Sequence, residues 1–243
     1  MRLLLHACCG PCSLEPTRLL RAAGHDLTIL YANSNIAPAE EYAHRLATLR
    51  AWAEDERLPV VEGAYDPERW EAGPGRIGEA QGDPVRREAR CRACYRLRLE
   101  EAATYASQAG FDGVGTTLSV SPYQYADVIR DELERAAAQA GVAAVFEDFR
   151  PFYDQATRRS RALGMYRQNY CGCRFSDAEA AAERAERKAA RAADAAARAE
   201  ERTASEAAQA ARRAERLAYA EKQAKKRAVL KALREQERSN TAE

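Results

Sequence analysis

The chain has 243 residues, of which 46 % are hydrophobic and 31 % are charged, and its formal net charge is +1. This length suggests one full domain with an attachment. No segment approaches the ~18 consecutive apolar residues of a membrane span, and the short apolar N-terminus does not match a signal peptide, so we expect a cytoplasmic protein.

The two parts of the chain differ sharply in composition. Residues 1–175 contain both Trp, all five Phe and all seven Cys. Residues 176–243 are mostly Ala, Glu, Arg and Lys, with one Tyr and neither Gly nor Pro. Because that composition cannot build a core, we expect one globular domain at residues 1–176 and a helical extension at residues 177–243.

The first part alternates between short apolar runs and segments of helical periodicity. The apolar runs have the length of buried strands and lie at residues 2–6, 26–33, 59–62, 113–117 and 142–146. The helical segments lie at residues 14–23, 38–56, 85–108 and 122–139. Residues 72–84, which include several Gly and two Pro, are expected to form a loop.

This order predicts the α/β class, with a Rossmann-like parallel sheet covered by helices on both faces and followed by a long charged C-terminal helix. Ligands bind such sheets at the carboxyl ends of the strands. The first strand leads into Cys8, Cys9 and Cys12, and the fourth leads into residues 116–123. Chemistry is therefore expected at this edge.

The cysteines form three groups: Cys8, Cys9 and Cys12; Cys91 and Cys94; and Cys171 and Cys173. The first group lies at a predicted helix start, where the helix dipole favours thiolates. The i, i+3 spacing of the second group puts both sulfurs on one face of a helix. In a reducing compartment, such clustering indicates metal ligands or redox catalysts rather than structural disulfides.

Several interpretations of these groups remain open. One C-x-x-C could be a pair of small buried side chains, and two pairs could hold a structural zinc, but zinc needs only four ligands. Seven thiols fit an iron–sulfur cluster better. The pair Cys171 and Cys173 could bind a further metal ion or act as a redox dithiol, because a disulfide at that spacing is strained and easily reduced.

The chain resembles the metal-cluster, cobalamin-independent epoxyqueuosine reductases of the QueH type. The resemblance covers residues 2–176 and is carried by LLLHACCGPCS (3–13), CRACYRLRL (91–99), GTTLSVSPY (115–123) and NYCGCRFS (169–176). Weaker support comes from YANSNIAPAEEY (31–42) and RPF (150–152). It implies a sheet related to the nucleotide alpha hydrolases, whose phosphate loop is here replaced by a Cys-rich turn, so we do not expect ATP use.

The resemblance also implies the reaction and the roles of the thiols. Epoxyqueuosine in the anticodon loop of transfer RNA loses its epoxide oxygen and becomes queuosine, the last step of queuosine biosynthesis, with electrons from an unidentified external donor. By carry-over of the motifs, a [4Fe–4S] cluster is assigned to Cys8, Cys9, Cys91 and Cys94. The resemblance makes Cys171 and Cys173 the redox pair, linked by a transient disulfide, or the ligands of an additional mononuclear iron; Cys12 joins that site, lines it or is a buried structural thiol.

Polar residues near the same edge are candidates for contact with substrate. Tyr123 is a candidate proton donor, and Ser119, Ser121 and Asn35 are candidate substrate-binding residues. Ser121 could equally cap the helix that follows it. His6, at the end of the first strand, is interpreted as a core residue rather than a ligand.

The extension has high helix propensity but no heptad pattern of large aliphatic residues. Two interpretations stay open for it: a solvated helix without a specific function, or a grip on transfer RNA through the basic stretch at residues 222–234. For the whole chain, the alternatives to the reductase are a zinc-stabilised RNA-binding module without redox activity and a thiol-based sulfur carrier or transfer-RNA thiolation enzyme, which would need ATP.

Overall fold

The protein contains a five-stranded parallel sheet with strand order β3-β2-β1-β4-β5 in the computed structural model, which describes residues 1–78 and 84–240. The strands are β1 (Arg2–His6), β2 (Asp26–Tyr31), β3 (Val60–Glu62), β4 (Gly113–Thr116) and β5 (Ala143–Val145). The predicted α/β class is confirmed.

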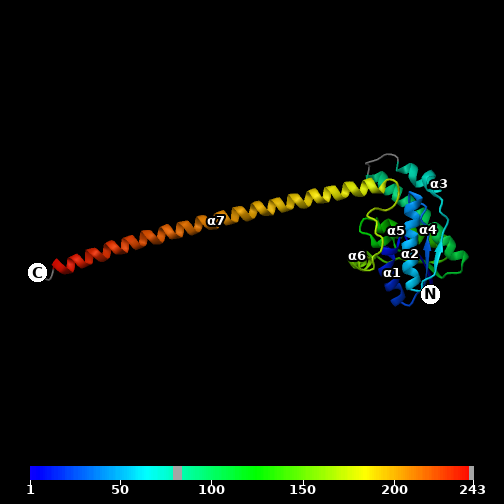
Figure 1. The fold of residues 1–243 in the computed structure, drawn as a ribbon, viewed down its shortest axis with the longest axis horizontal. Coiled ribbons are helices and arrows are strands. Elements are labelled where there is room, and N and C mark those ends of the chain that lie inside the picture. The colour runs from blue at the N-terminus through cyan, green and yellow to red at the C-terminus, as the bar shows by residue number, and fades with distance from the viewer. Residues whose placement is uncertain (79–83, 241–243) are drawn as a thin grey trace. The chain divides into compact units, whose positions relative to one another are not determined.

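Helices cover both faces of this sheet (Figure 1). The described α-helices are α1 (Gly10–Ala22), α2 (Ala39–Asp55), α3 (Pro67–Trp70), α4 (Pro84–Gln108), α5 (Ala126–Ala140), α6 (Tyr153–Ala162) and α7 (Ser176–Asn240). Helices α1, α2 and α6 pack on one face, and α4 and α5 pack against each other on the opposite face. Among the described residues, every helix is too short or too polar to cross a membrane.

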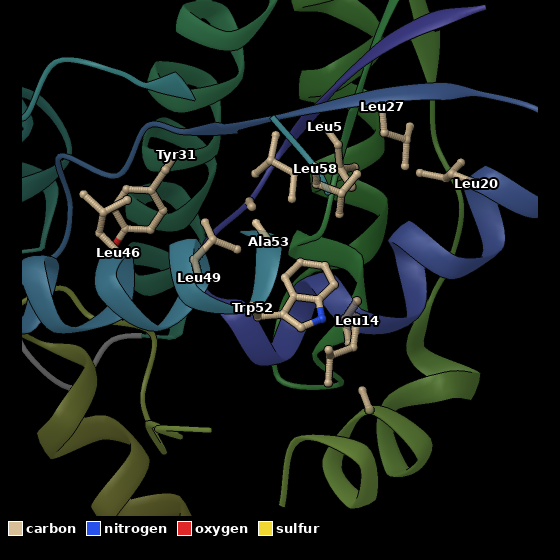
Figure 2. Packing of buried hydrophobic residues seen from close by; sticks show 14 of the residues in the cluster. Leu5, Leu14, Leu20, Leu27, Tyr31, Leu46, Leu49, Trp52, Ala53 and Leu58 are labelled. Carbon is tan, nitrogen blue, oxygen red and sulfur yellow. The ribbon is translucent and has the colours of Figure 1, made fainter. Parts of the chain in front are cut away.

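The core divides into two layers because side chains alternate along the central strand. Leu5 of β1 is fully buried against the α1 and α2 layer, where it lies among Leu14, Leu49 and Trp52 (Figure 2). Leu4, its neighbour in sequence, is also fully buried, but in the layer formed with α4 and α5. A strand that is apolar on both faces is typical of a central parallel strand.

Two expectations about loops and helix starts were wrong. Residues 71–75 form a π-helical turn after α3 instead of a loop, supported by Asp66, which caps α3 by accepting a bond from the Arg69 amide at 3.0 Å. Residues 79–83, also expected to be loop, lie outside the described residues. Helix α5 begins at Ala126 rather than residue 122, because the preceding residues form a 3₁₀ turn, Leu118–Val120, and then a hydrogen-bonded turn.

The chain divides into two compact units, Met1–Ala180 and Ala181–Glu243. The first contains the whole sheet and helices α1 to α6. The second consists of the continuation of α7. We keep these boundaries below, because the first unit contains every cysteine.

We predict that Leu5→Ala lowers the free energy of unfolding of the first unit by about 2–5 kcal/mol, because it leaves a cavity in a closed layer. Chemical denaturation followed by Trp fluorescence measures this, since both Trp lie in that unit. The control is Leu217→Ala in α7, whose side chain is 72 % exposed, and it should change the midpoint little. Equal effects of the two substitutions would contradict the described core.

Candidate metal centre

The candidate site lies where the order of the strands reverses. Strand β1 pairs with both β2 and β4, so the segments that leave β1 and β4 meet at one edge of the sheet. Cys8 follows β1 and Thr117 follows β4, and the Cys8 amide donates to the Thr117 hydroxyl at 3.3 Å. This contact confirms the prediction that the residues after β1 and β4 lie at the same edge of the sheet.

Cys8, Cys9 and Cys12 form the tightest group of potential ligands. Their three Sγ atoms all lie within 4.8 Å of one another, and the Cys8 and Cys9 sulfurs are 3.9 Å apart. The extended N-cap residue Cys9 precedes α1, and the Ser13 hydroxyl donates to its carbonyl at 2.8 Å. Within the described ranges, this is the one group of three or more such side chains that meets that distance, so these sulfurs could hold a metal ion.

The pKa values of these three thiols favour the binding of a cation. Hydrogen bonds from the thiols of Cys12 and Cys9 hold the pKa of Cys8 well below its usual range. The same bond to Cys8 raises the pKa of Cys12 well above it. These shifts favour the thiolate form of Cys8 and the protonated form of Cys12. A metal ion would displace the thiol protons and bind the sulfurs as thiolates.

The other four cysteines lie within electrostatic reach of one another. Cys91 and Cys94 come from α4, and Cys171 and Cys173 come from the loop before α7. Burial raises the pKa of Cys91 to about 12, and negative charge on Cys171 adds to the rise. Cys94 and Cys173 share a small apolar cluster, and burial raises the pKa of both thiols. Thiolates here need a cation to offset their charge.

The loop that contains Cys171 and Cys173 is held by hydrogen bonds on both sides of Gly172. The Arg45 guanidinium donates to the Cys171 carbonyl at 2.8 Å, and the Gly172 amide donates to the Ser176 hydroxyl at 2.9 Å. Gly172 has a φ of +125°, a backbone conformation that residues other than glycine rarely adopt. A Cβ on it would lie 3.0 Å from both Arg45 and Ile36.

Arg98 supplies a buried positive charge between the groups. It is 2 % exposed, and its guanidinium donates to the Asn33 side-chain oxygen, whose amide in turn donates to the Ala7 carbonyl at 2.9 Å. In the described part of the chain, no carboxylate forms a salt bridge with it. A buried guanidinium without a carboxylate needs another source of negative charge.

Thiolates of the cysteines would be that source. Burial alone would lower the pKa of Arg98, but negative charge on Cys94, Cys171 and Cys8 outweighs it and raises the pKa. Sequence reasoning did not assign Arg98 a role. The signal was present, because Cys91, Cys94 and Arg98 recur at i, i+3 and i+7 and therefore share one face of α4.

The predicted substrate-binding residues occupy different environments. The buried Ser119 hydroxyl donates to the Glu147 carbonyl at 2.7 Å, and the Ser121 hydroxyl accepts from the Tyr123 amide at 3.3 Å. Ser121 does not cap α5, because the N-cap is Tyr125. Tyr123 is 49 % exposed, and its ring meets the edge of another tyrosine ring. Asn35 is buried with its side-chain oxygen unpartnered, which leaves an acceptor for a ligand.

His6 is a core residue, as expected. Its Nδ1 lies 3.0 Å from the Thr116 hydroxyl and its Nε2 lies 3.1 Å from the Ala32 carbonyl. Burial lowers the pKa of His6 to about 3, so the ring is neutral at physiological pH. Both ring nitrogens are occupied by the fold, and neither is available to a metal.

The comparison with known proteins decides what kind of site this is. Residues 3–179 match the family model described as "Epoxyqueuosine reductase QueH". The chain belongs to the QueH family. The matched residues include every cysteine of both groups, so the candidate metal centre lies wholly inside the QueH region.

Individual QueH relatives agree with the family model. The chain is 33 % identical over 181 residues to an epoxyqueuosine reductase QueH of Histophilus somni, which covers 72 % of each chain. It is 33 % identical over 179 residues to that of Acinetobacter baylyi, covering 72 % of this chain and 80 % of the relative. It is 32 % identical over 185 residues to that of Thermotoga maritima, covering 75 % of this chain and 94 % of the relative.

The QueH region ends near the start of α7. The family match stops at residue 179, whereas α7 continues to Asn240. The relatives above cover at most 75 % of this chain. Roles assigned from the family therefore apply to the first unit only.

We predict that Gly172→Ala lowers the free energy of unfolding by about 1–3 kcal/mol and reduces the metal bound by the purified protein. The strained backbone and the contacts with Arg45 and Ile36 would shift the flanking thiols. Metal analysis and chemical denaturation measure the two effects. Gly73→Ala is the matched control, because nothing lies within 4 Å of its added Cβ. If Gly172→Ala retains full metal content, the loop does not position ligands.

Proposed function

We propose that this chain is an epoxyqueuosine reductase that converts epoxyqueuosine to queuosine in the anticodon loop of transfer RNA. The observation that carries the proposal is the gathering of family-matched cysteines at the switch point of the sheet. The family match favours this activity over a zinc-stabilised RNA-binding module.

The overall reaction consists of a two-electron reduction with loss of oxygen. Both C–O bonds of the epoxide break, a C=C double bond forms between the two carbons, and the oxygen leaves as water. Two electrons and two protons are consumed. The electrons come from an external donor, and the protons come from solvent or from acidic side chains beside the substrate.

The thiols divide into two donor sets that fit iron. A [4Fe–4S] cluster takes four thiolates. The resemblance assigns the cluster to Cys8, Cys9, Cys91 and Cys94. The electrostatic interactions among the thiols support an alternative division. We propose that the cluster is held by Cys91, Cys94, Cys171 and Cys173, and that Cys8, Cys9 and Cys12 hold a mononuclear iron.

Two observations support this division. Cys12 lies with Cys8 and Cys9 inside a single 4.8 Å group, which supports their binding one metal ion together. Among the charge interactions of Cys91, the largest is with Cys171. This interaction links the pair on α4, Cys91 and Cys94, to the pair in the loop before α7, Cys171 and Cys173. When bound, iron would supply electrons singly and Lewis acidity toward the epoxide oxygen.

The side chains of the protein have defined tasks in this proposal. Arg98 offsets the negative charge of the thiolates without approaching the substrate. Tyr123, half exposed in the turn that follows β4, donates a proton to the leaving oxygen. The unpartnered oxygen of Asn35 accepts a hydrogen bond from the modified nucleoside. The two sets are electrostatically linked, since Cys8 contributes to the charge around Cys171.

The division of thiols predicts different outcomes for two matched substitutions. Cys94→Ser should abolish the visible cluster absorption of anaerobically purified protein and its conversion of epoxyqueuosine in transfer RNA. Cys12→Ser should keep the absorption and lose about one iron per chain, with conversion reduced. Iron analysis, visible spectra before and after dithionite, and nucleoside analysis measure these effects.

Two results would contradict the proposal at different levels. Loss of the cluster absorption in Cys12→Ser, but not in Cys94→Ser, would reverse the division of thiols. A colourless protein with one tightly bound zinc, in which iron reconstitution yields no cluster, would overturn the reductase and favour the zinc-stabilised RNA-binding module.

A second prediction concerns the buried charge. Arg98→Gln should lower the midpoint potential of the bound cluster by about 60 mV or more, because removal of a nearby positive charge disfavours the reduced state. Arg98→Lys, which keeps the charge, should shift it less. Arg96→Gln is the control, since Arg96 lies on the same helix but pairs with Glu132 at 2.9 Å. Equal potentials for Arg98→Gln and Arg96→Gln would contradict the role of Arg98.

A further inference from the structure

The excess of positive charge lies on the extension, outside the family match. Residues 181–243 contain 16 Lys and Arg against 11 Asp and Glu, a net charge of +5. Residues 1–180 contain 22 Lys and Arg against 26 Asp and Glu, a net charge of −4. The unit with the metal centre therefore has no net attraction for a polyanion. If its substrate is transfer RNA, as proposed above, the positive charge of the extension adds long-range attraction for it.

The basic residues of the extension follow the helix period. Ten exposed basic residues follow one another at spacings of 3, 4, 7 or 11 positions. We call these residues the basic stripe: Arg184, Arg187, Arg191, Arg198, Arg202, Arg213, Arg216, Arg227, Lys231 and Arg234. Eleven residues make about three turns of an α-helix, so these positions stay on one face of a straight helix. Lys222, Lys225 and Lys226 lie on the other faces.

Repulsion between like charges of the basic stripe destabilises the isolated helix. Like charges three or four residues apart repel, and Arg198 and Arg202, as well as Arg213 and Arg216, stand in this relation. No acidic residue stands three or four positions from Arg213, Arg216 or Arg227 in the sequence. Elsewhere on the same helix an acidic residue stands one turn before a basic one, as Glu183 does for Arg187 at 3.4 Å and Glu221 for Lys225 at 3.0 Å.

The extension lacks the features that other partners need. A coiled coil requires a continuous seam of aliphatic residues, and a membrane-surface helix requires an apolar face. The large apolar side chains described in this unit are exposed and too few for a continuous seam, because Tyr219 and Leu230 share one face whereas Leu217 and Val229 lie on others. A row of guanidinium and ammonium groups on one face complements a row of phosphates.

We infer that the basic stripe binds the phosphate backbone of the transfer RNA whose anticodon nucleoside the first unit reduces. This inference rests on the proposed function for the identity of the RNA. Such contacts fix no sequence, so the stripe adds affinity for the RNA without choosing the modified nucleoside. The reduction itself requires only the first unit.

The test compares two triple substitutions in the full chain. Arg213→Gln, Arg216→Gln and Arg227→Gln remove three charges from the stripe. Lys222→Gln, Lys225→Gln and Lys226→Gln remove three charges from the other faces of the same helix. Gln keeps helix propensity, and circular dichroism should show equal helicity. Fluorescence anisotropy measures binding of an unmodified transfer-RNA transcript at several salt concentrations.

We expect the stripe variant to bind the transcript about 10-fold more weakly. The slope of log K against log salt should become shallower by roughly three, about one for each phosphate that the variant no longer neutralises. The other variant should stay within twofold of the parent. Equal weakening of both variants, or no binding by the parent, would overturn the inference. So would stripe-dependent binding to phosphatidylglycerol vesicles in the absence of transcript binding.

The readout separates this inference from the proposed function. The transcript lacks epoxyqueuosine, so its binding does not depend on the reaction. Single-turnover reduction at saturating epoxyqueuosine-containing RNA should be unchanged in the stripe variant. If the chain binds the transcript through the stripe but never reduces the nucleoside, the proposed function fails and the RNA-binding stripe remains.

Discussion

Burial of negative charge at the carboxyl edge of the sheet is the constraint on which the rest of the site depends. Cys8, Cys9 and Cys12 lie there, Cys171 is within electrostatic reach of Cys8, and a buried thiolate is costly unless a positive charge lies beside it. Arg98 is buried without a carboxylate and takes its negative partners from the cysteines. Burial raises the pKa of Cys91 and Cys94, so the thiolate state depends on a bound cation. Together, these observations support the binding of a metal ion by the buried thiols.

The sheet order makes this arrangement possible. β1 and β4 are neighbours, so residues more than a hundred positions apart meet in the contact of Cys8 with Thr117. The loop around Gly172 is added from the end of the same unit and is fixed by Arg45. Nucleotide-binding sheets place phosphate at this edge. Here the turn after β1 presents three sulfurs instead.

The sequence allowed accurate prediction where local rules dominate. The strand at residues 2–6 and the parallel sheet follow from apolar runs of the right length, and helix α7 follows from propensity. The start of α5 was missed because Pro122 resembles a helix start, whereas the turn before Ala126 depends on side-chain bonds. Arg98 was missed because an arginine in a helix is normally a surface residue, and only tertiary packing buries it.

In the reaction proposed above, iron held by the thiols of this protein removes the epoxide oxygen from a transfer-RNA nucleoside. The most direct measurement mixes anaerobic, iron-loaded, reduced protein with transfer RNA bearing epoxyqueuosine and follows the nucleoside by mass spectrometry alongside the electrons consumed. The account predicts queuosine, a product lighter by one oxygen atom, at two electrons for each molecule formed. An unchanged nucleoside, or an epoxide opened by water without electron uptake, would contradict it.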